Sequence, residues 1–401
     1  MSAFPARLAR PTAPNRTTAP VRSGPPHRTA APRTAVRRTG AVAPGRRAPG
    51  AAGAAVLLAA AASGISGPSL ALPAAAPALH VPTGSAAWLM TAYGLGLLLR
   101  TPLLAAAAGR HGPGALIRSG AALVALGAAI VQAAPAALLP LAAERTMEAA
   151  GAAGLTVAAF RTAGRDRTGR STGLVAIGNA AGGTLGLFVG AGAAQLLGWR
   201  AALVMPLLAL AVLPAALRSA GRRDTLKVAS GRFRDALPLG LLRRVAFRRP
   251  ALLMLAVATV NFALVYGAPR RVAALTGWGP LPTGAAVAAV ALGGALLSWQ
   301  LVRFAPALGS GRVRVLLTAG SLAAAGAAAF APWPALVLLG SGLSSLVTAG
   351  GQGVLTGSAV GGLDPERQGG AIGLFNLAFP AGVAAGPVLA AFADQTVQFL
   401  Y

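Results

Sequence analysis

The chain contains no cysteine, and its 401 residues include only three histidines and eight acidic residues. The lack of cysteine excludes disulfides, thiolate metal sites and cysteine nucleophiles. So few acids and histidines leave little material for acid–base catalysis or a metal centre, and neither a Walker phosphate loop nor a Ser/His/Asp set is recognisable. We therefore expect neither an enzyme nor an ATP-driven pump, and no cofactor or metal.

Charged residues are scarce as well, at 11% of the chain, whereas hydrophobic residues reach 55%. Soluble domains contain about 25% charged residues. This chain has too few charged residues to cover the surface of a soluble protein of its size. The composition therefore indicates a polytopic membrane protein.

Apolar runs of roughly 20 residues follow one another along the chain, each long enough to cross a bilayer core of about 30 Å. They are continuous rather than alternating, so helices are expected instead of barrel strands. The predicted fold is an all-α polytopic membrane protein of eleven transmembrane helices, at residues 54–78, 86–108, 114–133, 135–160, 171–196, 199–217, 250–268, 282–303, 313–331, 334–357 and 369–393.

These runs divide the chain into two helical halves. We expect a disordered Arg/Pro-rich cytoplasmic tail at residues 1–52, a six-helix half at 53–217, a basic cytoplasmic linker at 218–249 and a five-helix half at 250–401. The tail also resembles an organellar transit peptide, and a mis-assigned start is a further alternative. After Asp394 only a short segment remains, so a twelfth helix is expected to be missing.

The net charge of +27 is carried almost wholly by arginine, with Lys227 as the single lysine. When the connections between spans are taken alternately from the N-terminus, one set holds 30 of the 35 basic residues and the other holds three. This asymmetry predicts a multi-pass plasma-membrane protein with a cytoplasmic N-terminus. The basic segments are then expected to contact anionic lipid. Nucleic acid is not expected as a partner, because aromatic residues do not interleave with these patches.

A short signature recurs in the two halves. Arg170 and Gly173 precede Asn179, and Arg367 and Gly370 precede Asn376 with the same spacing, 197 positions further along. Each copy lies at the start of an apolar helix. Repeated halves with a binding site between them are typical of secondary transporters.

Segments that follow one another along the chain resemble motifs of the major facilitator superfamily, in particular its drug:proton antiporters, over about residues 60–394. They are residues 70–93 (first helix to second helix, with the Leu-Pro and the Trp88…Tyr93 pair), Arg110-His-Gly112 (cytoplasmic loop), Arg145-Thr-Met-Glu148 (helix four), Gly182 to Gly190 (antiporter motif of helix five) and Gly198-Trp199-Arg200 (start of helix six). The resemblance implies two pseudo-repeated halves around a central cavity.

The chain also departs from that family pattern. Gly109 replaces the acid of the cytoplasmic loop, whose paired arginines are absent, and Leu187 stands in place of the antiporter-motif proline. Ala149 replaces the glycine after the helix-four motif, and Gly64 occupies the place of the first-helix acid.

The function implied by the resemblance is export of a small amphipathic or drug-like molecule by a monomer, through alternating access coupled to protons. Two alternatives stay open. One is an importer of a small metabolite in the same fold, and the other is a degenerate membrane protein that does not transport.

Ionisable residues inside spans are the first site candidates, since they are costly to insert. Glu144, Arg145 and Glu148 lie in the fourth predicted span, where Arg145 and Glu148 share a helix face and can pair. We expect Glu148 to exchange a proton, with Arg145 competing for its carboxylate. The alternative is a fixed structural ion pair.

Polar residues inside other spans are candidates for a substrate cavity. They are Arg100, Tyr93, Asn179, Asn261, Tyr266, Gln352 and Asn376. Alternatives are snorkelling for Arg100 and interhelical hydrogen bonds for the asparagines. Ser344, Ser345 and Thr348 extend the polar face of the seventh and tenth predicted helices. Residues expected to serve gating or tight helix packing are Arg110, Gly112, Gly182, Gly186, Gly190, Gly382, Gly386 and Pro387.

Overall fold

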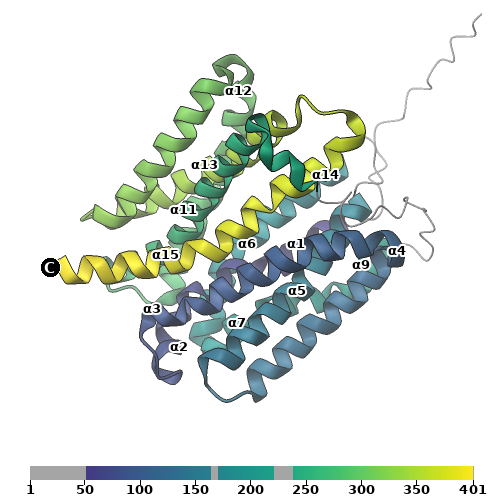
Figure 1. Ribbon diagram of the computed structural model, residues 1–401. Coiled ribbons are helices and arrows are strands. Elements are labelled where there is room, and N and C mark those ends of the chain that lie inside the picture. The colour runs from purple at the N-terminus through teal and green to yellow at the C-terminus, as the bar shows by residue number, and fades with distance from the viewer. Residues whose placement is uncertain (1–50, 164–169, 221–237, 401) are drawn as a thin grey trace, which may run out of the picture. The chain divides into compact units, whose positions relative to one another are not determined.

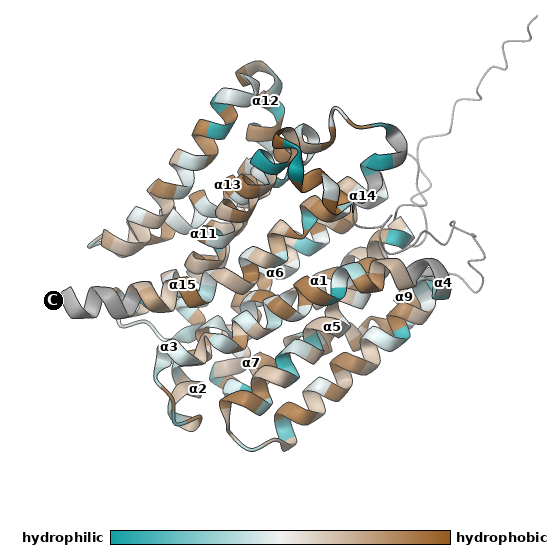
Figure 2. Cartoon of the chain, viewed as in Figure 1, coloured by the Kyte–Doolittle hydropathy of each residue, from teal (hydrophilic) through white to brown (hydrophobic). Residues whose placement is uncertain are grey.

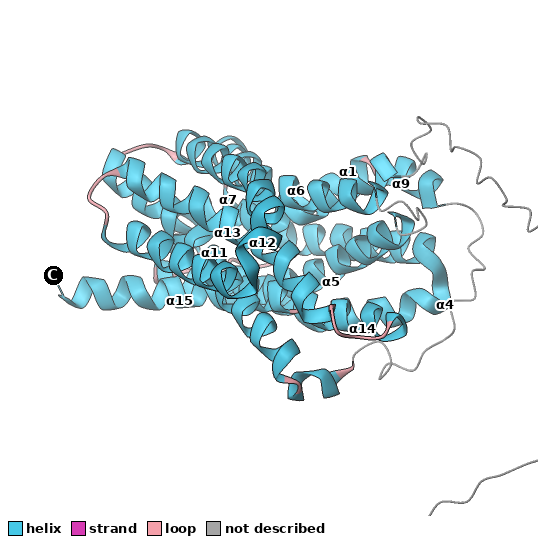
Figure 3. Cartoon of the chain, turned by 90° about the horizontal axis from the view of Figure 1, so that it is seen from above, coloured by secondary structure: helices cyan, strands magenta, loops and turns pink. Residues whose placement is uncertain are grey.

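Helices form every regular element among the residues that the computed structural model describes, which are 51–163, 170–220 and 238–400 (Figure 3). The all-α prediction is thereby confirmed. The described residues belong to one unit, Arg47–Tyr401. Nearly all of the predicted tail and the centre of the predicted basic linker lie outside the described residues.

The N-terminal half contains four helices longer than fifteen residues, separated and followed by short ones (Figure 1). Its elements are α1 Ala51–Ser66, η1 Gly67–Leu70, α2 Leu72–Ala78, α3 Thr83–Ala86, α4 Trp88–Ala133, α5 Leu138–Ala163, α6 Arg170–Leu197, α7 Trp199–Leu203, η2 Met205–Leu207, α8 Leu208–Ala211 and α9 Leu213–Ala220.

The C-terminal half repeats this pattern with fewer interruptions. Its elements are η3 Leu239–Arg243, α11 Val245–Thr276, α12 Pro280–Phe330, α13 Pro334–Val360, α14 Pro365–Asn376 and α15 Ala378–Leu400.

The longest helix of each half doubles back at a glycine. Gly112 in α4 and Gly309 in α12 have φ angles of 73° and 76°, a conformation that glycine adopts without steric cost. A methyl group on Gly154 of α5 would lie 3.8 Å from Leu104 Cδ1 and 3.4 Å from the Leu116 carbonyl, so both arms of α4 pack on α5. Gly112 and Gly309 are 197 positions apart, the same offset as in the sequence signature.

The predicted number of membrane-spanning helices is not confirmed by the structure. Eight helical stretches of the described chain are long and apolar enough to cross a membrane, so the count of eleven is not confirmed. The stretch Pro280–Phe330 is a single one of the eight, although it contains the break at Gly309. The predicted span 135–160 corresponds to α5, which carries four charged residues, and it is not among the eight.

Prolines explain where predicted spans are interrupted. The predicted span 199–217 is a series of short helices, because Pro206 and Pro214 lack the N–H that a continuous helix requires. The predicted span 54–78 is interrupted after Ser66 in the same way, where Gly67 and Pro68 begin a 3-10 turn.

Glycines allow the closest helix contacts in both halves. Gly182 and Gly186 of α6 lie against the backbone of α1, and Gly190 lies against Gly67 at the start of η1. An added Cβ on Gly186 would approach the Ser63 carbonyl oxygen to 2.6 Å. Gly386 of α15 lies against the α11 backbone in the corresponding way, as does Gly382. Small residues at i, i+4 spacing permit such close crossings between membrane helices.

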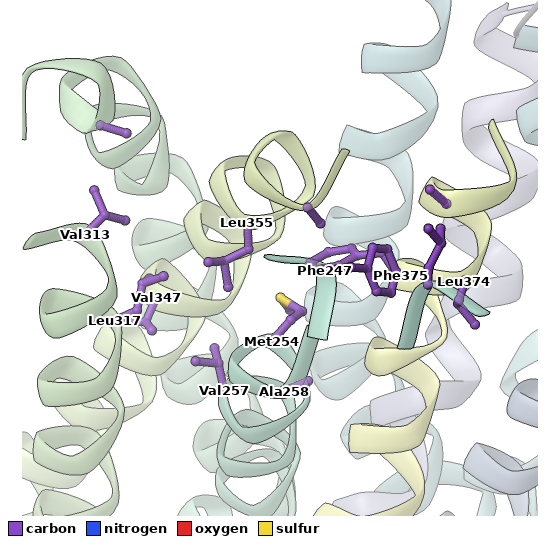
Figure 4. Packing of buried hydrophobic residues seen from close by; sticks show 14 residues of the cluster. Phe247, Met254, Val257, Ala258, Val313, Leu317, Val347, Leu355, Leu374 and Phe375 are labelled. Atoms are coloured by element: carbon purple, nitrogen blue, oxygen red, sulfur yellow. The ribbon is translucent and has the colours of Figure 1, made fainter. Parts of the chain in front are cut away.

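Apolar side chains fill the interior of each half and also cover much of its exterior. In the C-terminal half Phe247, Met254, Leu317 and Phe375 belong to one buried cluster (Figure 4). Brown and pale colours dominate most of the helices in Figure 2. Exposed large residues such as Leu196, at 80% exposure, suit contact with lipid.

Candidate functional site

A cavity of about 620 Å³ lies between the two halves. The N-terminal half contributes residues of α1, α5 and α6, and the C-terminal half contributes residues of α11 to α15. Its volume is in the range of small-molecule sites, which run from roughly 300 to 1,000 Å³. The polar side chains that line it are Ser66, Asn179, Thr184, Asn261, Ser341, Ser345, Thr348, Gln352, Thr356 and Asn376.

The repeated signature converges on this cavity. Asn179 of α6 and Asn376 at the end of α14 occupy equivalent positions in the two copies, and both line the cavity. Asn261 and Gln352, also predicted as cavity residues, line it too, and Asn261 Oδ1 accepts a hydrogen bond of 3.2 Å from Ser344. The two halves therefore present amides to a common space.

Three residues predicted for the cavity lie elsewhere. Tyr93 is buried in the N-terminal half, where its hydroxyl donates to the Ala61 carbonyl at 3.2 Å. Tyr266 is also fully buried and donates to the Thr83 carbonyl at 3.3 Å. Arg100 is exposed and is not among the lining residues. Polarity inside a span indicated that the two tyrosines need partners, but helix packing provides these partners away from the cavity.

Several lining residues were missed by the sequence analysis. On α13 the polar positions 341, 345, 348, 352 and 356 recur at three- and four-residue steps, which is one face of a helix. The same spacing predicts that Ser341 and Thr356 also face the cavity, although they are not among the cavity residues predicted above. Phe160, Phe262 and Phe379 gave no signal, because phenylalanine is common in every apolar span.

One end of the molecule joins the two halves. We call it the closed end and define it by Thr83, Ala133, Gly198, Thr276 and Trp333, where helices end or begin. The opposite end, which we call the basic end, holds the breaks at Gly112 and Gly309 and the exposed residues Arg118, Arg243 and Arg314.

Contacts across the closed end are close. Thr91 Oγ1 of α4 donates to the Ala384 carbonyl of α15 at 2.8 Å. Leu70, Leu187 and Ala191 of one half form a buried cluster with Val287 of the other. The cavity extends from this cluster towards the basic end, where its lining includes Phe160 and Thr356 near the ends of α5 and α13.

The three charged residues predicted in the fourth span form a separate buried cluster within the N-terminal half. Glu144, Arg145 and Glu148 are 2%, 0% and 0% exposed, and none of them lines the cavity. Arg145 and Glu148 form an ion pair, as their spacing predicts. The guanidinium also lies over the Tyr93 ring, 4.2 Å from its centroid.

Arg145 links this cluster to two other segments. Its terminal nitrogens donate to the carbonyl oxygens of Leu203 and Gly64, each at 2.7 Å. Gly64 directly precedes Ile65 and Ser66, which line the cavity. The cluster is therefore connected to the cavity wall through the backbone of α1.

Two carboxylates of the cluster keep unpaired oxygens. Neither oxygen of Glu144 has a hydrogen-bond partner among the described residues, and Glu148 Oε1 has none there either. Glu144 lies against α4 at Gly127, where an added Cβ would be 2.8 Å from Glu144 Oε1. Burying a charged carboxylate without a partner is costly, so these oxygens are suitable places to bind a proton.

The residues predicted for gating lie at helix breaks and crossings. Gly112 forms the break in α4, and Pro387 lies inside α15 next to the packed Gly386. Arg110 lies in α4, and its side chain is outside the described residues.

A second cavity, of about 760 Å³, lies at the basic end of the C-terminal half, with Arg249 and Arg314 in its wall. Residues of α11, α12 and α13 line it, and none of the predicted site residues is among them. Since it does not join the two halves, their relative movement would not open and close it.

Two repeated helical halves around a common cavity define the architecture of a secondary transporter. Comparison with sequence families agrees, because the model of the Major Facilitator Superfamily matches residues 52–387. The chain therefore belongs to the Major Facilitator Superfamily and is a multi-pass membrane transporter by fold. No curated protein sequence matches it significantly.

Solved structures of transporters have a similar fold. A bacterial homolog of the human lysosomal transporter Spinster, in an inward-facing and unoccupied conformation, has a TM-score of 0.65 at 17% identity, over 86% of this chain and 82% of the other. The nucleoside transporter NupG gives 0.66 at 12% identity, over 85% and 90%. The human organic anion transporter MFSD10 (TETRAN) gives 0.56 at 16% identity, over 89% and 98%.

Proposed function

We propose that this protein exports a small amphipathic or drug-like molecule by alternating access, with inward movement of protons as the driving force. The observation that carries the proposal is the cavity between the halves, to which the signature repeats contribute Asn179 and Asn376 and which is sealed at one end by contacts between the halves. Closing the basic end while opening the closed end would expose the same residues to the other side.

The proposed orientation follows the distribution of basic residues. If the basic end is cytoplasmic, as expected for the plasma membrane, the described state is inward-facing with its cavity directed to the cytoplasm. Exposed arginines at this end, among them Arg118 and Arg314, are then placed to contact anionic lipid headgroups. The transporter is proposed to act as a monomer, because the central cavity is formed by the two halves of a single chain.

Proton coupling is proposed to work through Glu148 and Arg145. With Glu148 ionised, Arg145 is held in the ion pair and bonds the Gly64 and Leu203 carbonyls. A proton on Glu148 removes the charge that Arg145 pairs with, and this weakens the restraint on α1 next to Ile65 and Ser66 of the cavity. Glu144 lies one position before Arg145 and offers a second carboxylate for the same proton.

The proposal predicts that Glu148→Gln abolishes proton-driven accumulation of the uncharged amphipathic dye N-phenyl-1-naphthylamine in everted membrane vesicles. Glutamine keeps the size of the side chain but cannot exchange a proton. The measurement is the dye fluorescence after the vesicle interior is made more acidic than the outside. The amount of inserted protein is matched by immunoblot. Exchange of the dye without a gradient should persist in the variant.

Asp364→Asn is the matched control, because Asp364 is an exposed carboxylate at the start of α14. Its accumulation should equal that of the unmodified protein. Undiminished accumulation by Glu148→Gln would remove Glu148 from the coupling mechanism. Accumulation in right-side-out vesicles with an acidic exterior would favour a proton-driven importer, because only symport moves the dye and protons inwards together. Accumulation in neither arrangement would favour a protein that does not transport.

A further inference from the structure

Charge is absent from the described wall of the central cavity. None of its described lining residues is Asp, Glu, Lys, Arg or His. The buried Glu144, Arg145 and Glu148 lie in the N-terminal half outside the cavity, and Arg145 already has a partner. A charged ligand would therefore lose hydration on entry without gaining an opposite charge, which is strongly unfavourable in an apolar environment.

Hydrogen-bonding groups, in contrast, are plentiful and partly unused. Thr348 lines the cavity and is 5% exposed, and its buried hydroxyl has no hydrogen-bond partner among the described residues. No hydrogen bond to the side-chain amides of Asn179, Gln352 or Asn376 occurs within the described part of the chain either. An amide offers both donors and an acceptor, so these groups match a ligand that carries both kinds of polar atom.

Aromatic side chains supply the other part of the wall. Phe262 of α11 and Phe379 of α15 pack edge to face, with ring centroids 5.1 Å apart, and both line the cavity. Phe160 of α5 lines it from the N-terminal half. Aromatic rings favour contact with flat apolar or aromatic surfaces, which they can meet in stacked or edge-on arrangements.

We propose that the central cavity selects uncharged molecules that combine hydrogen-bond donors and acceptors with an aromatic face, and that it rejects cations and anions of the same size. This inference rests on the proposed transport function, since it concerns the substrate of the same cavity. Selection arises because the amides and the Thr348 hydroxyl replace hydration of neutral polar groups but cannot replace the hydration of a full charge.

The test uses equilibrium binding to the purified full-length protein in detergent, with no ion gradient. The probes are radiolabelled N-acetylphenylalaninamide, which is uncharged, N-acetylphenylalanine, which is an anion, and phenylalaninamide, which is a cation at pH 6. Adenosine, adenosine 5′-monophosphate and 1-methyladenosine form a second neutral, anionic and cationic set. In at least one set the uncharged member should bind at least tenfold more tightly than both charged members.

Two variants locate the effect in the cavity. Thr348→Val keeps the shape of the side chain but removes its hydroxyl, and should weaken binding of the uncharged probe several-fold. Gln352→Glu adds a negative charge at nearly constant size, and should raise the affinity for the cationic probe about tenfold while lowering that for the uncharged one. Gln132→Glu is the matched control, because Gln132 is exposed at the closed end and does not line the cavity.

The outcomes are separable from those of the vesicle experiment. Equal or tighter binding of a charged probe in both sets, or no binding of any of the six, overturns the inference. An unchanged charge preference in Gln352→Glu would overturn its assignment to this cavity. Because binding is measured without a gradient, loss of proton-driven export would contradict the proposed function while leaving a neutral preference in place.

Discussion

The surroundings of Arg145 explain how this chain can lack the first-helix acid of the family pattern. The family resemblance places an acid in the first helix at Gly64, and here the carbonyl of Gly64 accepts a hydrogen bond from Arg145. A Cβ on Gly64 would lie 2.8 Å from the Tyr93 hydroxyl and 2.9 Å from Pro206 Cδ, so this space is filled. Glu148 supplies a carboxylate to Arg145 from its own helix instead.

Reintroducing the family acid should therefore destabilise this protein. We expect Gly64→Ala to lower the free energy of unfolding by about 1–3 kcal/mol through overpacking. Gly64→Asp should lower it further, because it also buries another carboxylate. Melting of the purified protein, followed by size-exclusion chromatography after heating, measures both. Gly326→Ala is the control, since a Cβ there meets nothing within 4 Å; equal melting of Gly64→Asp and the unmodified protein would show that the site accepts the acid.

At the scale of elements, the crossing of α1 and α6 is the helix contact whose geometry follows most clearly from a sequence pattern. Glycines at positions 178, 182 and 186 face the α1 backbone at residues 55, 59 and 63, and Gly190 faces Gly67 at the start of η1. The two helices therefore run side by side with matched turns. Without a hydrophobic driving force between helices in lipid, such close backbone contact is a major source of helix association.

Adding a methyl group within this crossing should separate the helices. Gly182→Ala is expected to lower the melting temperature by several degrees, because its Cβ would overlap the Ala59 backbone. Gly183→Ala, one position further along the same helix, has no atom within 4 Å of its Cβ and should leave stability unchanged. Both are measured by thermal melting in detergent. Identical melting of the two variants would mean that this contact does not hold α6 in place.

Some positions of helices and cavity residues could be predicted from the sequence, and others could not. Hydropathy located the long helices, because lipid requires continuous apolar stretches, and the i, i+4 glycines indicated a close crossing. It did not reveal that residues 199–217 break at Pro206 and Pro214, because their apolarity is unaffected by proline. In the cavity, Asn179 and Asn376 were predicted because a side-chain amide inside a span needs a polar partner. The locations of Tyr93 and Tyr266 were not, since the sequence does not tell which face of a span meets another helix.

At the scale of the whole molecule, the contacts at the closed end determine from which side of the membrane the cavity is accessible. Gly284 of α12 is central there, because a Cβ would lie 2.7 Å from Ala191 Cβ, 3.0 Å from Leu70 Cδ1 and 3.3 Å from the Leu187 carbonyl oxygen. All three neighbours belong to the other half. A larger side chain at this position should therefore disfavour the state described here and favour one in which the closed end is open.

The natural absence of cysteine makes this shift measurable with a single introduced thiol. Ala180→Cys places it in the cavity wall. If the basic end is cytoplasmic, a membrane-impermeant maleimide should label it faster in everted than in right-side-out vesicles. Adding Gly284→Leu should reverse that preference, because the leucine wedges the closed end apart. Gly293→Leu on the same helix, where a Cβ has nothing within 4 Å, should leave it unchanged. Faster labelling from the other side before any glycine is replaced would contradict the orientation, and equal effects of the two leucines would contradict the role of Gly284 in closure.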